Sequence, residues 1–539
     1  MNQYAKHAII NGDTSLGIEL GSTRIKAVLI DHNFSIIASS SYNWENKLVD
    51  GYWTYSIDEM IHGLQQVYRQ LKLDVEKKYG IVLQRIGSIG CSAMMQGYIA
   101  LDKSGDLLVP FRTWRNATTG EAALELTEKF KFKIPQRWSI AHLYQAILNN
   151  EKHVKHLDYI ITMSGYVHWR LTGNRTIGIC DASGMFPIDE STKQFNEGML
   201  DIFDDLTAGE NLGWHIRDVL PEVNAAGKHA GYLHESGALL LDPSGNLKAG
   251  IPLCPPEGDA ATGMVATNSV KKRTGNISAG TSIFAMLVLE KDLSAVYPEI
   301  DIINTPEGNP VAMVLANNCS GDINAWVSLF EEFYQAMGLK PDSSQIFNIL
   351  FKKAMEADAD GGGLLSYGYY SAENITGFAQ GRPLFVRSAE SRFNLANFMR
   401  MHLFTAFAAL RIGIDILTQK EHMNIDNILA HGGLFKTPIV GQKMCAAALN
   451  IPVSVMSTAG EGGAWGMAVL ARFSVSNARH KSLTDYLANK VFKDVKGEML
   501  YPEISDVNGF TLYMERYKEG LAVEQAAIEH LIINTKEYQ

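Results

Sequence analysis

Two short stretches, one in each half of this 539-residue chain, share one form: a glycine and two hydroxyl residues directly follow an apolar, strand-like run. The first is Gly21-Ser22-Thr23 and the second is Gly280-Thr281-Ser282, and another apolar run follows each of them. A strand, a tight turn and a second strand predict a β-hairpin. Glycine lets the backbone approach an anion closely, and amides in such a turn form an anion-binding concavity. Either turn alone is an ordinary hairpin, but the pair predicts two similar domains that hold phosphate groups between them.

Charge and composition limit the kinds of molecule that we expect the protein to bind. The chain is too long for one hydrophobic core, so several domains are expected. It is 46% hydrophobic and 20% charged, with a formal net charge of −10, which is ordinary for a soluble globular protein. Because no basic block stands out, we expect no nucleic-acid partner. A bound phosphate would then depend on local amides and a metal ion rather than on a general positive field.

The cysteines and the N-terminus predict the compartment. The chain has five cysteines, scattered and without a Cys-x-x-Cys pair, which is typical of reduced thiols in the cytosol. Residues 1–14 lack a basic region followed by an apolar stretch, so no signal peptide is expected. No apolar run approaches the roughly 20 residues of a membrane-spanning helix. The sequence therefore predicts a cytoplasmic protein with no membrane partner.

The pattern of apolar residues predicts an α/β fold that repeats once. A three-stranded meander is expected over residues 16–41, followed by a helix that begins at Ser56, where Ser56 and Glu59 have capping-box spacing. A strand is expected over residues 86–92. After Pro252 the pattern restarts, and the expected elements are a hairpin at 274–290, a helix at 394–420, a strand at 428–430, a helix at 438–449, a strand at 453–455, a helix at 462–471 and a C-terminal helix at 512–533.

Four motifs in order resemble those of the FGGY family of carbohydrate kinases. Residues 17–27 resemble its first phosphate motif, Gly258-Asp259-Ala260-Ala261 its catalytic segment, and Gly280-Thr281-Ser282 its second phosphate motif. Residues 431–453 resemble its adenosine motif, and Glu461 with residues 466–468 fit the usual ending. Residues 171–173 and 181–184 also match a family stretch, and we interpret these as structural.

The resemblance implies a fold and a division into domains. It implies an α/β protein with two similar domains of the actin and hexokinase, or ribonuclease H-like, type, in which ATP and a sugar meet in an interdomain cleft. The expected divisions are an N-terminal sugar-binding domain (1–268), a C-terminal ATP-binding domain (269–485) and a helical extension (486–539). Family resemblance also makes a homodimer reasonable.

The same resemblance assigns roles to single residues. Asp259 would be the catalytic base that accepts the proton of a sugar hydroxyl. Glu19 takes the position of the usual aspartate and would organise Mg²⁺, through water because this ion sheds water reluctantly. Donors to the nucleotide phosphates would come from Gly21, Ser22, Thr23, Gly280, Thr281 and Ser282, while Gly432 and Gly433 would let adenosine lie against the backbone.

The sugar side is where the chain departs most from the family. Met95-Gln96-Gly97 stands where many members have Met-His-Gly, so Gln96 would replace a histidine that meets sugar hydroxyls. Trp114-Arg115-Asn116 resembles a segment of xylulokinases, with Asn116 at an aspartate position. We therefore expect Met95, Gln96, Trp114 and Asn116 to contact the sugar, with core packing as the alternative for Trp114.

The resulting hypothesis is an ATP- and Mg²⁺-dependent sugar kinase, with D-xylulose as first substrate and L-ribulose or another polyol or sugar as alternatives. A dinucleotide-dependent dehydrogenase would need Gly-x-Gly-x-x-Gly after the first strand, and residues 17–26 lack that spacing. A non-kinase ATPase on the same fold is the other alternative; Asp259 and the sugar-side segment argue against it.

Overall fold

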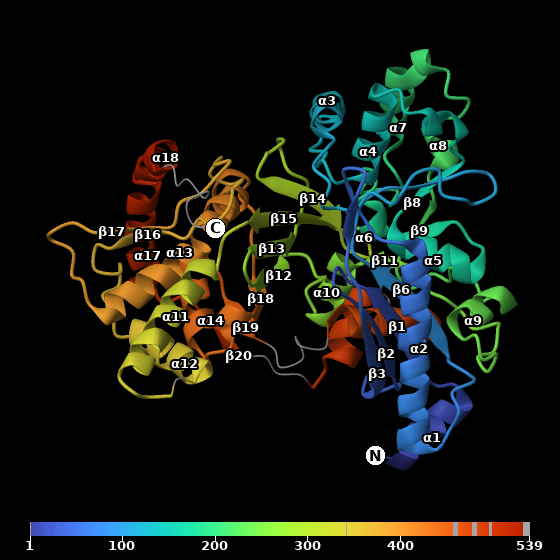
Figure 1. The fold of residues 1–539 in the computed structure, drawn as a ribbon, viewed down its shortest axis with the longest axis horizontal. Coiled ribbons are helices and arrows are strands. Elements are labelled where there is room, and N and C mark those ends of the chain that lie inside the picture. Colours follow the sequence, from blue (N-terminus) through green and yellow to red (C-terminus); the bar gives the residue numbers. More distant parts are fainter. Residues whose placement is uncertain (1, 341, 456–461, 477–481, 495–497, 532–539) are drawn as a thin grey trace. The chain divides into compact units, whose positions relative to one another are not determined.

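The computed structural model describes residues 2–340, 342–455, 462–476, 482–494 and 498–531 (Figure 1). These form two compact units. The first unit contains residues 1–271, 301–311 and 458–494, and the second contains residues 272–300, 312–457 and 495–539. Each unit is therefore assembled from separate stretches of chain, whereas the divisions expected from the sequence are continuous.

A five-stranded sheet forms the centre of the first unit, with the order β11-β6-β1-β2-β3. Strand β1 is antiparallel to β2 and parallel to β6, and β6 is parallel to β11. The predicted meander is confirmed. The five strands are β1 (Ser15–Leu20), β2 (Arg24–Ile30), β3 (Ile36–Asn43), β6 (Ser88–Ala93) and β11 (Glu257–Gly258).

Helices α2 (Ile57–Tyr79) and α15 (Gly462–Val475) pack on this sheet. The strand residues that each helix contacts show which face of the sheet it covers. Helix α2 packs on Ile25, because a Cβ on Gly63 would lie 2.5 Å from the Ile25 side chain. Helix α15 packs on Gly17, where a Cβ would lie 2.0 Å from the Ala464 carbonyl oxygen. Since neighbouring residues of a strand point to opposite faces, Glu19 lies on the α15 face of β1.

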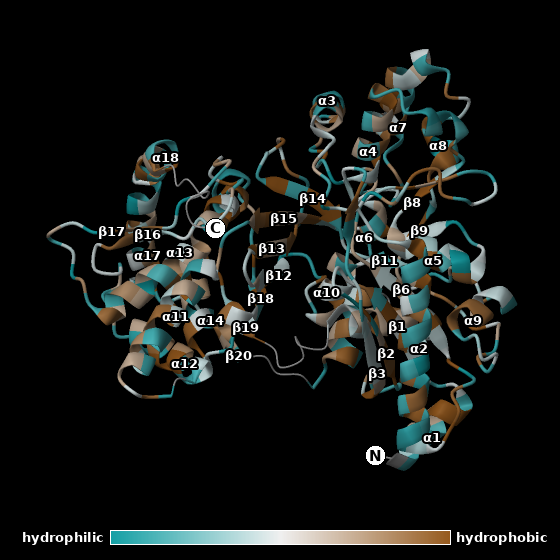
Figure 2. Ribbon diagram, viewed as in Figure 1, coloured by the Kyte–Doolittle hydropathy of each residue, from teal (hydrophilic) through white to brown (hydrophobic). Residues whose placement is uncertain are grey.

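The start of α2 is as the sequence predicted. The Ser56 side chain accepts a hydrogen bond from the Glu59 backbone amide at 3.4 Å. One apolar face of this helix is buried, at Met60, Leu64, Val67, Tyr68 and Leu71. Figure 2 shows hydrophilic and hydrophobic residues alternating along α2, as expected of a helix with one face in the core.

Smaller elements complete the first unit. Its two-stranded sheets pair β4 (Lys47–Val49) with β5 (Tyr52–Thr54), β7 (Ile99–Leu101) with β8 (Tyr159–Ile161), and β9 (Thr176–Gly178) with β10 (Glu222–Asn224). Its other α-helices are α1 (Asn2–Asn11), α3 (Gly120–Phe130), α4 (Ser139–Leu148), α5 (Met163–Thr172), α6 (Ile179–Ala182), α7 (Glu197–Thr207), α8 (Ile216–Val219), α9 (Glu235–Leu241), α10 (Asp259–Ala266) and α16 (Leu483–Tyr486).

The sheet of the second unit repeats this pattern. Strand β12 is antiparallel to β13 and parallel to β18, and β18 is parallel to β19. The full order is β14-β15-β13-β12-β18-β19-β20, which adds an antiparallel β20 beyond β19. The strands are β12 (Thr274–Ala279), β13 (Ile283–Val288), β14 (Ile300–Asn304), β15 (Pro310–Ala316), β18 (Asn427–Gly432), β19 (Val453–Val455) and β20 (Glu498–Leu500).

The long helix expected at residues 394–420 is α13 (Leu395–Asp415), extended by a π-helical turn over Ile416–Lys420. Within the described residues it is the one helix long and apolar enough to cross a membrane, and 78% of its apolar window is buried. Its burial is that of a core helix. The remaining elements are β16 (Leu365–Tyr367), β17 (Leu384–Val386), α11 (Gly321–Ala336), α12 (Ser343–Ala354), α14 (Val440–Leu449), α17 (Ile504–Glu519) and α18 (Leu521–His530).

The prediction of a single C-terminal helix over residues 512–533 is wrong. The chain forms α17 and α18, which meet at Gly520, and residues 532–533 lie outside the described part. A Cβ on Gly520 would lie 2.6 Å from the Tyr367 hydroxyl, so the break lies where the chain passes close to a buried tyrosine. An apolar repeat along the sequence does not reveal such a contact.

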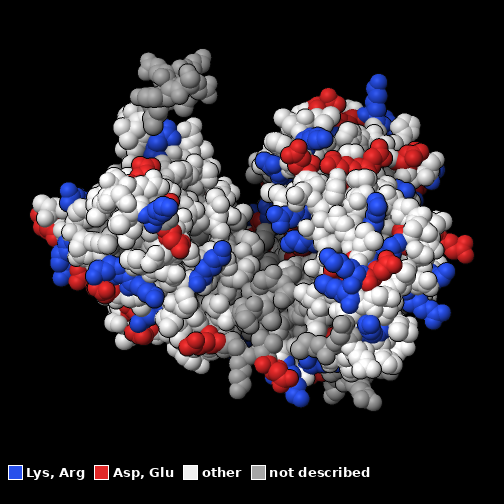
Figure 3. All heavy atoms as spheres, turned by 60° about the horizontal axis from the view of Figure 1, so that its bottom comes forward, with Lys and Arg blue, Asp and Glu red and all other residues white. Residues whose placement is uncertain are grey.

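Charged residues of both signs are mixed on the surface, and the cysteines lie in the interior. Figure 3 shows Lys and Arg interspersed with Asp and Glu over the visible face. All five cysteines, Cys91, Cys180, Cys254, Cys319 and Cys445, are free and buried.

Candidate active site

Three strands of the first sheet end together, and the residues that come after them form the core of the site. Leu20 of β1 and Gly258 of β11 are both register partners of Ala93 in β6. Because β1, β6 and β11 are parallel, the chain after each strand emerges at one edge of the sheet. This edge therefore brings together the Gly21 turn, the segment 94–97 and Asp259.

The first phosphate turn is held from behind by two aromatic side chains. Trp44 Nε1 donates to the Gly21 carbonyl oxygen at 2.7 Å, and the Tyr55 hydroxyl donates to the Ser22 carbonyl oxygen at 2.7 Å. The Gly21 amide itself donates to the Arg24 carbonyl oxygen at 2.9 Å. Ser22 and Thr23 remain exposed. The turn is thus a braced loop whose hydroxyls face solvent, as a phosphate ligand requires.

Asp259 is the first residue of α10 and remains exposed to solvent. The backbone amide of Met95 donates to its Oδ1 at 3.3 Å. Desolvation by the surrounding protein, together with the nearby charge of Glu19, raises the pKa of Asp259 to about 6. A carboxyl with these properties is suited to general-base catalysis near neutral pH.

Glu19 lies between the first phosphate turn and the start of α15. Lys26 Nζ is 3.8 Å from Glu19 Oε2, and a Cβ on Gly463 would lie 2.1 Å from Glu19 Oε1. Desolvation raises the pKa of Glu19, while Lys26 and the Ala464 amide oppose that shift. Among the described residues, no group of three or more His, Cys, Asp or Glu side chains forms a metal site. One carboxylate beside a phosphate turn fits Mg²⁺, which keeps several waters and shares its ligands with nucleotide phosphates.

The predicted sugar-side segment has an unusual backbone. Gln96 has a φ of +73° and Gly97 a φ of +84°, and the left-handed region is uncommon for a residue with a side chain. Met95 and Gln96 are both buried. A Cβ on Gly258 would lie 2.0 Å from Met95 Cγ, so this segment and the one that carries Asp259 are in close contact.

Trp114 and Asn116 differ in their surroundings. Trp114 is 41% exposed, which excludes the core-packing alternative and leaves its ring available to a ligand. Asn116 is buried, and its amide bonds the backbone of Trp53 and Thr113. Its polar atoms are therefore already used in holding strand β5 to the segment before Trp114.

The second phosphate turn is braced by a serine. Ser320 Oγ donates to the Gly280 carbonyl oxygen at 2.7 Å, and the Cys319 amide donates to the Thr281 carbonyl oxygen at 2.9 Å. Gly280 and Thr281 are exposed. A Cβ on Gly280 would meet nothing closer than the Ser282 carbonyl oxygen at 3.9 Å, so this glycine leaves open space at the turn.

The two glycines at the end of β18 have different roles. Gly432 has a φ of +110°, and a Cβ there would lie 2.1 Å from the Ala279 carbonyl oxygen. It is the register partner of Ala279, immediately before the second phosphate turn, so only glycine fits. Gly433 has open surroundings and lines a pocket.

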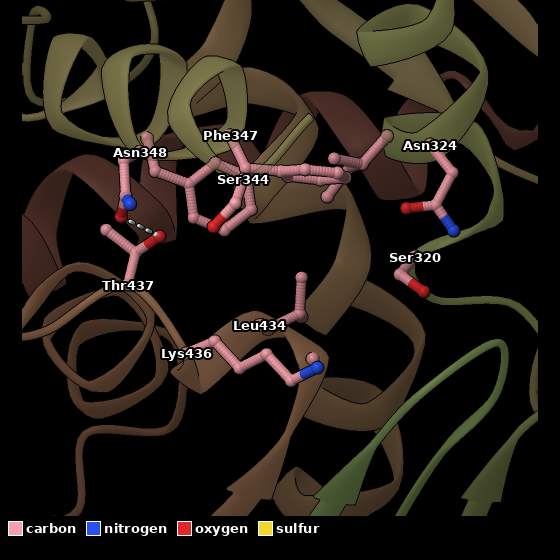
Figure 4. Close-up of a pocket in the computed structure, with 11 residues that line it drawn as sticks. Ser320, Asn324, Ser344, Phe347, Asn348, Leu434, Lys436 and Thr437 are labelled. Atoms are coloured by element: carbon pink, nitrogen blue, oxygen red, sulfur yellow. Dashed lines mark hydrogen bonds between the residues drawn. The ribbon is translucent and has the colours of Figure 1, made fainter. Parts of the chain in front are cut away.

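That pocket, of about 350 Å³, lies within the second unit and is shown in Figure 4. Its volume falls in the range of about 300–1,000 Å³ typical of small-molecule sites. Phe347 and Leu434 give it apolar walls, while the Thr437 hydroxyl donates to Asn348 Oδ1 at 3.0 Å at one end. It is lined by Ser320, Ile323, Asn324, Ser344, Phe347, Asn348, Phe351, Gly433, Leu434, Lys436 and Thr437.

Ser320 lines this pocket and also braces the second phosphate turn. The pocket and the turn are therefore adjacent, as a nucleotide with its base in one and its phosphates at the other requires. The residues of α11 and α12 in this wall were missed from the sequence, because they lie far from Gly433 along the chain and match no motif.

Comparison with known proteins agrees with this arrangement. The model of the N-terminal domain of the FGGY family of carbohydrate kinases matches residues 14–266, and that of the C-terminal domain matches residues 275–475. A xylulose kinase of Haemophilus influenzae is 21% identical over 535 residues, covering 94% of this chain and 99% of the relative.

Two solved structures show the fold. The xylulose kinase from Rhodospirillum rubrum has a TM-score of 0.77 at 16% identity and covers 96% of this chain and 100% of its own. The gluconate kinase from Lactobacillus acidophilus has a TM-score of 0.75 at 18% identity and covers 95% and 99%. The predicted two-domain actin and hexokinase-like fold is confirmed. With both of its domains matched, this chain belongs to the FGGY family of carbohydrate kinases and is a sugar kinase.

Proposed function

We propose that this kinase transfers the γ-phosphoryl group of ATP to a hydroxyl of a ketopentose, with D-xylulose as the first candidate. The observation that supports it most is the position of Asp259, at the sheet edge where the braced turn at Gly21 and the segment 94–97 also emerge. The named similarity to xylulose kinases supports the choice of sugar.

The residues divide the chemistry between them. Asp259 accepts the hydroxyl proton as the sugar oxygen bonds to phosphorus and ADP departs, so that the charge balances. The hydroxyls of Ser22, Thr23 and Thr281 donate to phosphate oxygens. Mg²⁺, held through Glu19, neutralises charge on the phosphates when it is bound.

Electrostatics favour a neutral acceptor over an acidic one. Asp259 has the carboxyl groups of Glu19 and Asp181 as acidic neighbours. An aldonate such as gluconate would bring a further carboxylate into these surroundings, which like charges disfavour. A ketopentose carries only hydroxyls and a carbonyl, which Gln96 can meet as donor and acceptor.

The amide of Gln96 does not by itself choose between hydroxyl configurations, so L-ribulose is the second candidate. An assay of ADP release with D-xylulose, L-ribulose, glycerol and gluconate, each with MgATP, tests the proposal. We expect the highest kcat/KM with D-xylulose. A preference for glycerol or gluconate would overturn the substrate. ATP hydrolysis that no sugar accelerates would point to a non-kinase ATPase.

A further inference from the structure

Behind Asp259, the first unit holds two further carboxyl groups that the proposed chemistry does not use. Asp181 lies in α6, and Glu257 lies in β11, two residues before Asp259. Asp181 is fully buried and Glu257 is 1% exposed. Burying an acidic side chain without a cationic partner costs folding free energy, so we expect these two residues to have a role.

The side-chain hydrogen-bond partners of Asp181 both lie at one of its oxygens. Its Oδ2 accepts hydrogen bonds from the hydroxyls of Thr162, at 2.7 Å, and Ser164. Its Oδ1 is buried and has no hydrogen-bond partner within the described residues. This carboxyl therefore keeps one acceptor free for a donor.

Glu257 shows the same asymmetry. Its Oε2 accepts the backbone amide of Asp181 at 3.1 Å, while its Oε1 is buried and has no partner within the described residues. A Cβ on Gly178 would lie 2.4 Å from Oε1, so the fold leaves out a side chain there to make room for this carboxyl. The two acids are thus joined through one backbone amide, and each has one orphan oxygen.

Among the described residues, no Lys, Arg or His forms an ion pair with Asp181, Glu257 or Asp259. The groups that act on the pair are each other, Asp259, the hydroxyls of Thr162 and Ser164, and the backbone amides of Gln96, Cys180 and Gly258. The thiols of Cys180 and Cys254 lie close by, and the nearby acids help to raise their pKa values. Two ionised acids so close together in a low-dielectric interior disfavour each other.

We propose that Asp181 and Glu257 form a buried carboxyl pair that shares one proton, with Glu257 as the neutral partner, and that this pair positions the sugar-side backbone against Asp259. A proton on Glu257 removes one of the two buried charges and turns its orphan oxygen into a donor, while the orphan oxygen of Asp181 stays an acceptor. Burial and the charge of Asp181 raise the pKa of Glu257 well above its usual value, in line with this assignment.

The pair acts on the site through the backbone. The amide of Gln96, which has the left-handed φ of +73°, favours the ionised form of Asp181. The amide of the preceding residue, Met95, donates to Asp259 at 3.3 Å. Two successive amides of one strained segment are thus directed at acids from two other segments. Asp181 and Glu257 are accordingly positioning residues for the sugar kinase, and the inference rests on the proposed roles of Asp259 and the segment 94–97.

Glu257→Gln tests whether Glu257 is neutral or ionised in the folded protein. Glutamine has nearly the shape of the neutral acid and, like it, can donate a hydrogen bond. We expect this variant to fold and to keep kcat/KM for the sugar within about threefold. Asp181→Asn should instead raise the sugar KM at least about tenfold with a smaller change in kcat, because it removes the charge that holds the Gln96 amide. A loss of kcat/KM beyond about 100-fold in Glu257→Gln, or its failure to fold, would overturn the proposal.

Two readouts do not depend on the substrate and keep this inference separable from the proposed function. The folded protein holds a proton that the unfolded chain releases above the ordinary glutamate pKa of 4.5, so wild-type stability falls as pH rises through this window. Since glutamine cannot release that proton, the Tm of Glu257→Gln relative to wild type should rise between pH ~5 and pH ~8. Glu128→Gln, an exposed change on α3, should show no such trend.

The second readout is infrared spectroscopy at neutral pH. The wild-type protein should show a carboxylic-acid C=O band that Glu257→Gln abolishes and Glu128→Gln retains. A constant Tm difference, or an unchanged infrared spectrum, would overturn the shared proton even if the kinase assignment stands.

Discussion

The two sheets have the same frame and different chemistry at their edges. In the first, β1 pairs with β2 through Leu20 and Ile25, and in the second β12 pairs with β13 through Ala279 and Ile283, with a phosphate turn closing each hairpin. The neighbouring parallel strands differ in the residues at their carboxyl ends. β6 and β11 lead to the segment 94–97 and Asp259, whereas β18 leads to Gly432 and Gly433 beside a pocket.

The difference lies in charge. The edge of the first sheet gathers carboxyl groups whose pKa values are raised by desolvation. Of the residues that line the pocket in the second unit, Lys436 alone is charged, and the rest are apolar, amide, hydroxyl or glycine residues. Under the proposed function, one frame would serve proton transfer in one half and recognition of a flat, largely uncharged group in the other. Substitutions confined to one edge test this division.

Asp259→Asn should have the largest effect. Loss of a general base typically lowers turnover about 100- to 10,000-fold. ATP binding, measured by isothermal titration, should stay unchanged, because the pocket lies in the other unit. Asp106→Asn, an exposed change in the loop after β7, is the matched control and should leave turnover unchanged. A variant that keeps more than roughly a tenth of wild-type turnover would contradict the base assignment.

The two phosphate turns can be compared directly through Thr23→Val and Thr281→Val. Each change keeps the shape of an exposed side chain and removes one hydroxyl. A hydrogen bond to a charged group is worth about 1.5–3 kcal/mol, so we expect kcat/KM for ATP to fall about 10- to 150-fold in each variant. The binding constant for sugar should hardly change. If only one variant shows the loss, the two turns do not share the phosphates, and if neither does, they do not bind them.

Local patterns predicted the frame well and the packing between distant segments poorly. The meander, the helix after Ser56 and the strand at 453–455 depend on apolar periodicity and capping, which are local. The partnership of Asp181 with Glu257 depends on strands and helices that meet only in the fold, so residues 181–184 were interpreted as structural. The braces Trp44 and Tyr55 were missed for the same reason.

Single residues within the motifs show the same limit. The motif predicted equal roles for Gly432 and Gly433, but the backbone of Gly432 is fixed by its contact with Ala279, and Gly433 is the one that lines the pocket. The amide of Asn116 bonds the backbone of Trp53 in this structure, which the motif did not indicate. The sugar contact of Asn116 stays a prediction.

Phe347→Ala tests the pocket of the second unit. Phe347 lies on α12, partly buried in the wall of the pocket. Stacking of a base on an aromatic ring is worth about 1–3 kcal/mol, so the Kd for ATP should rise roughly 5- to 150-fold, with little change in sugar binding. Ile349→Ala, at an exposed position of the same helix, is the control. An unchanged Kd in Phe347→Ala would place the base elsewhere.

The smallest expected effect is the dependence of the reaction rate on pH. It distinguishes the two sheet edges, because the titratable carboxyl groups lie at the edge of the first sheet. A base must be ionised, and the pKa of Asp259 is raised to about 6, so kcat/KM for sugar should fall as pH drops through that value rather than through the ordinary 3.8. At saturating MgATP, the rate constant at pH ~5 should be about tenfold below its plateau, since each pH unit below the pKa removes about nine-tenths of the ionised form. Thr281→Val should lower the plateau without moving this limb, because its hydroxyl does not titrate. An acid limb that shifts in Thr281→Val, or that lies near pH 4 in the wild type, would show that the titrating group is not Asp259 in the surroundings described for the first unit.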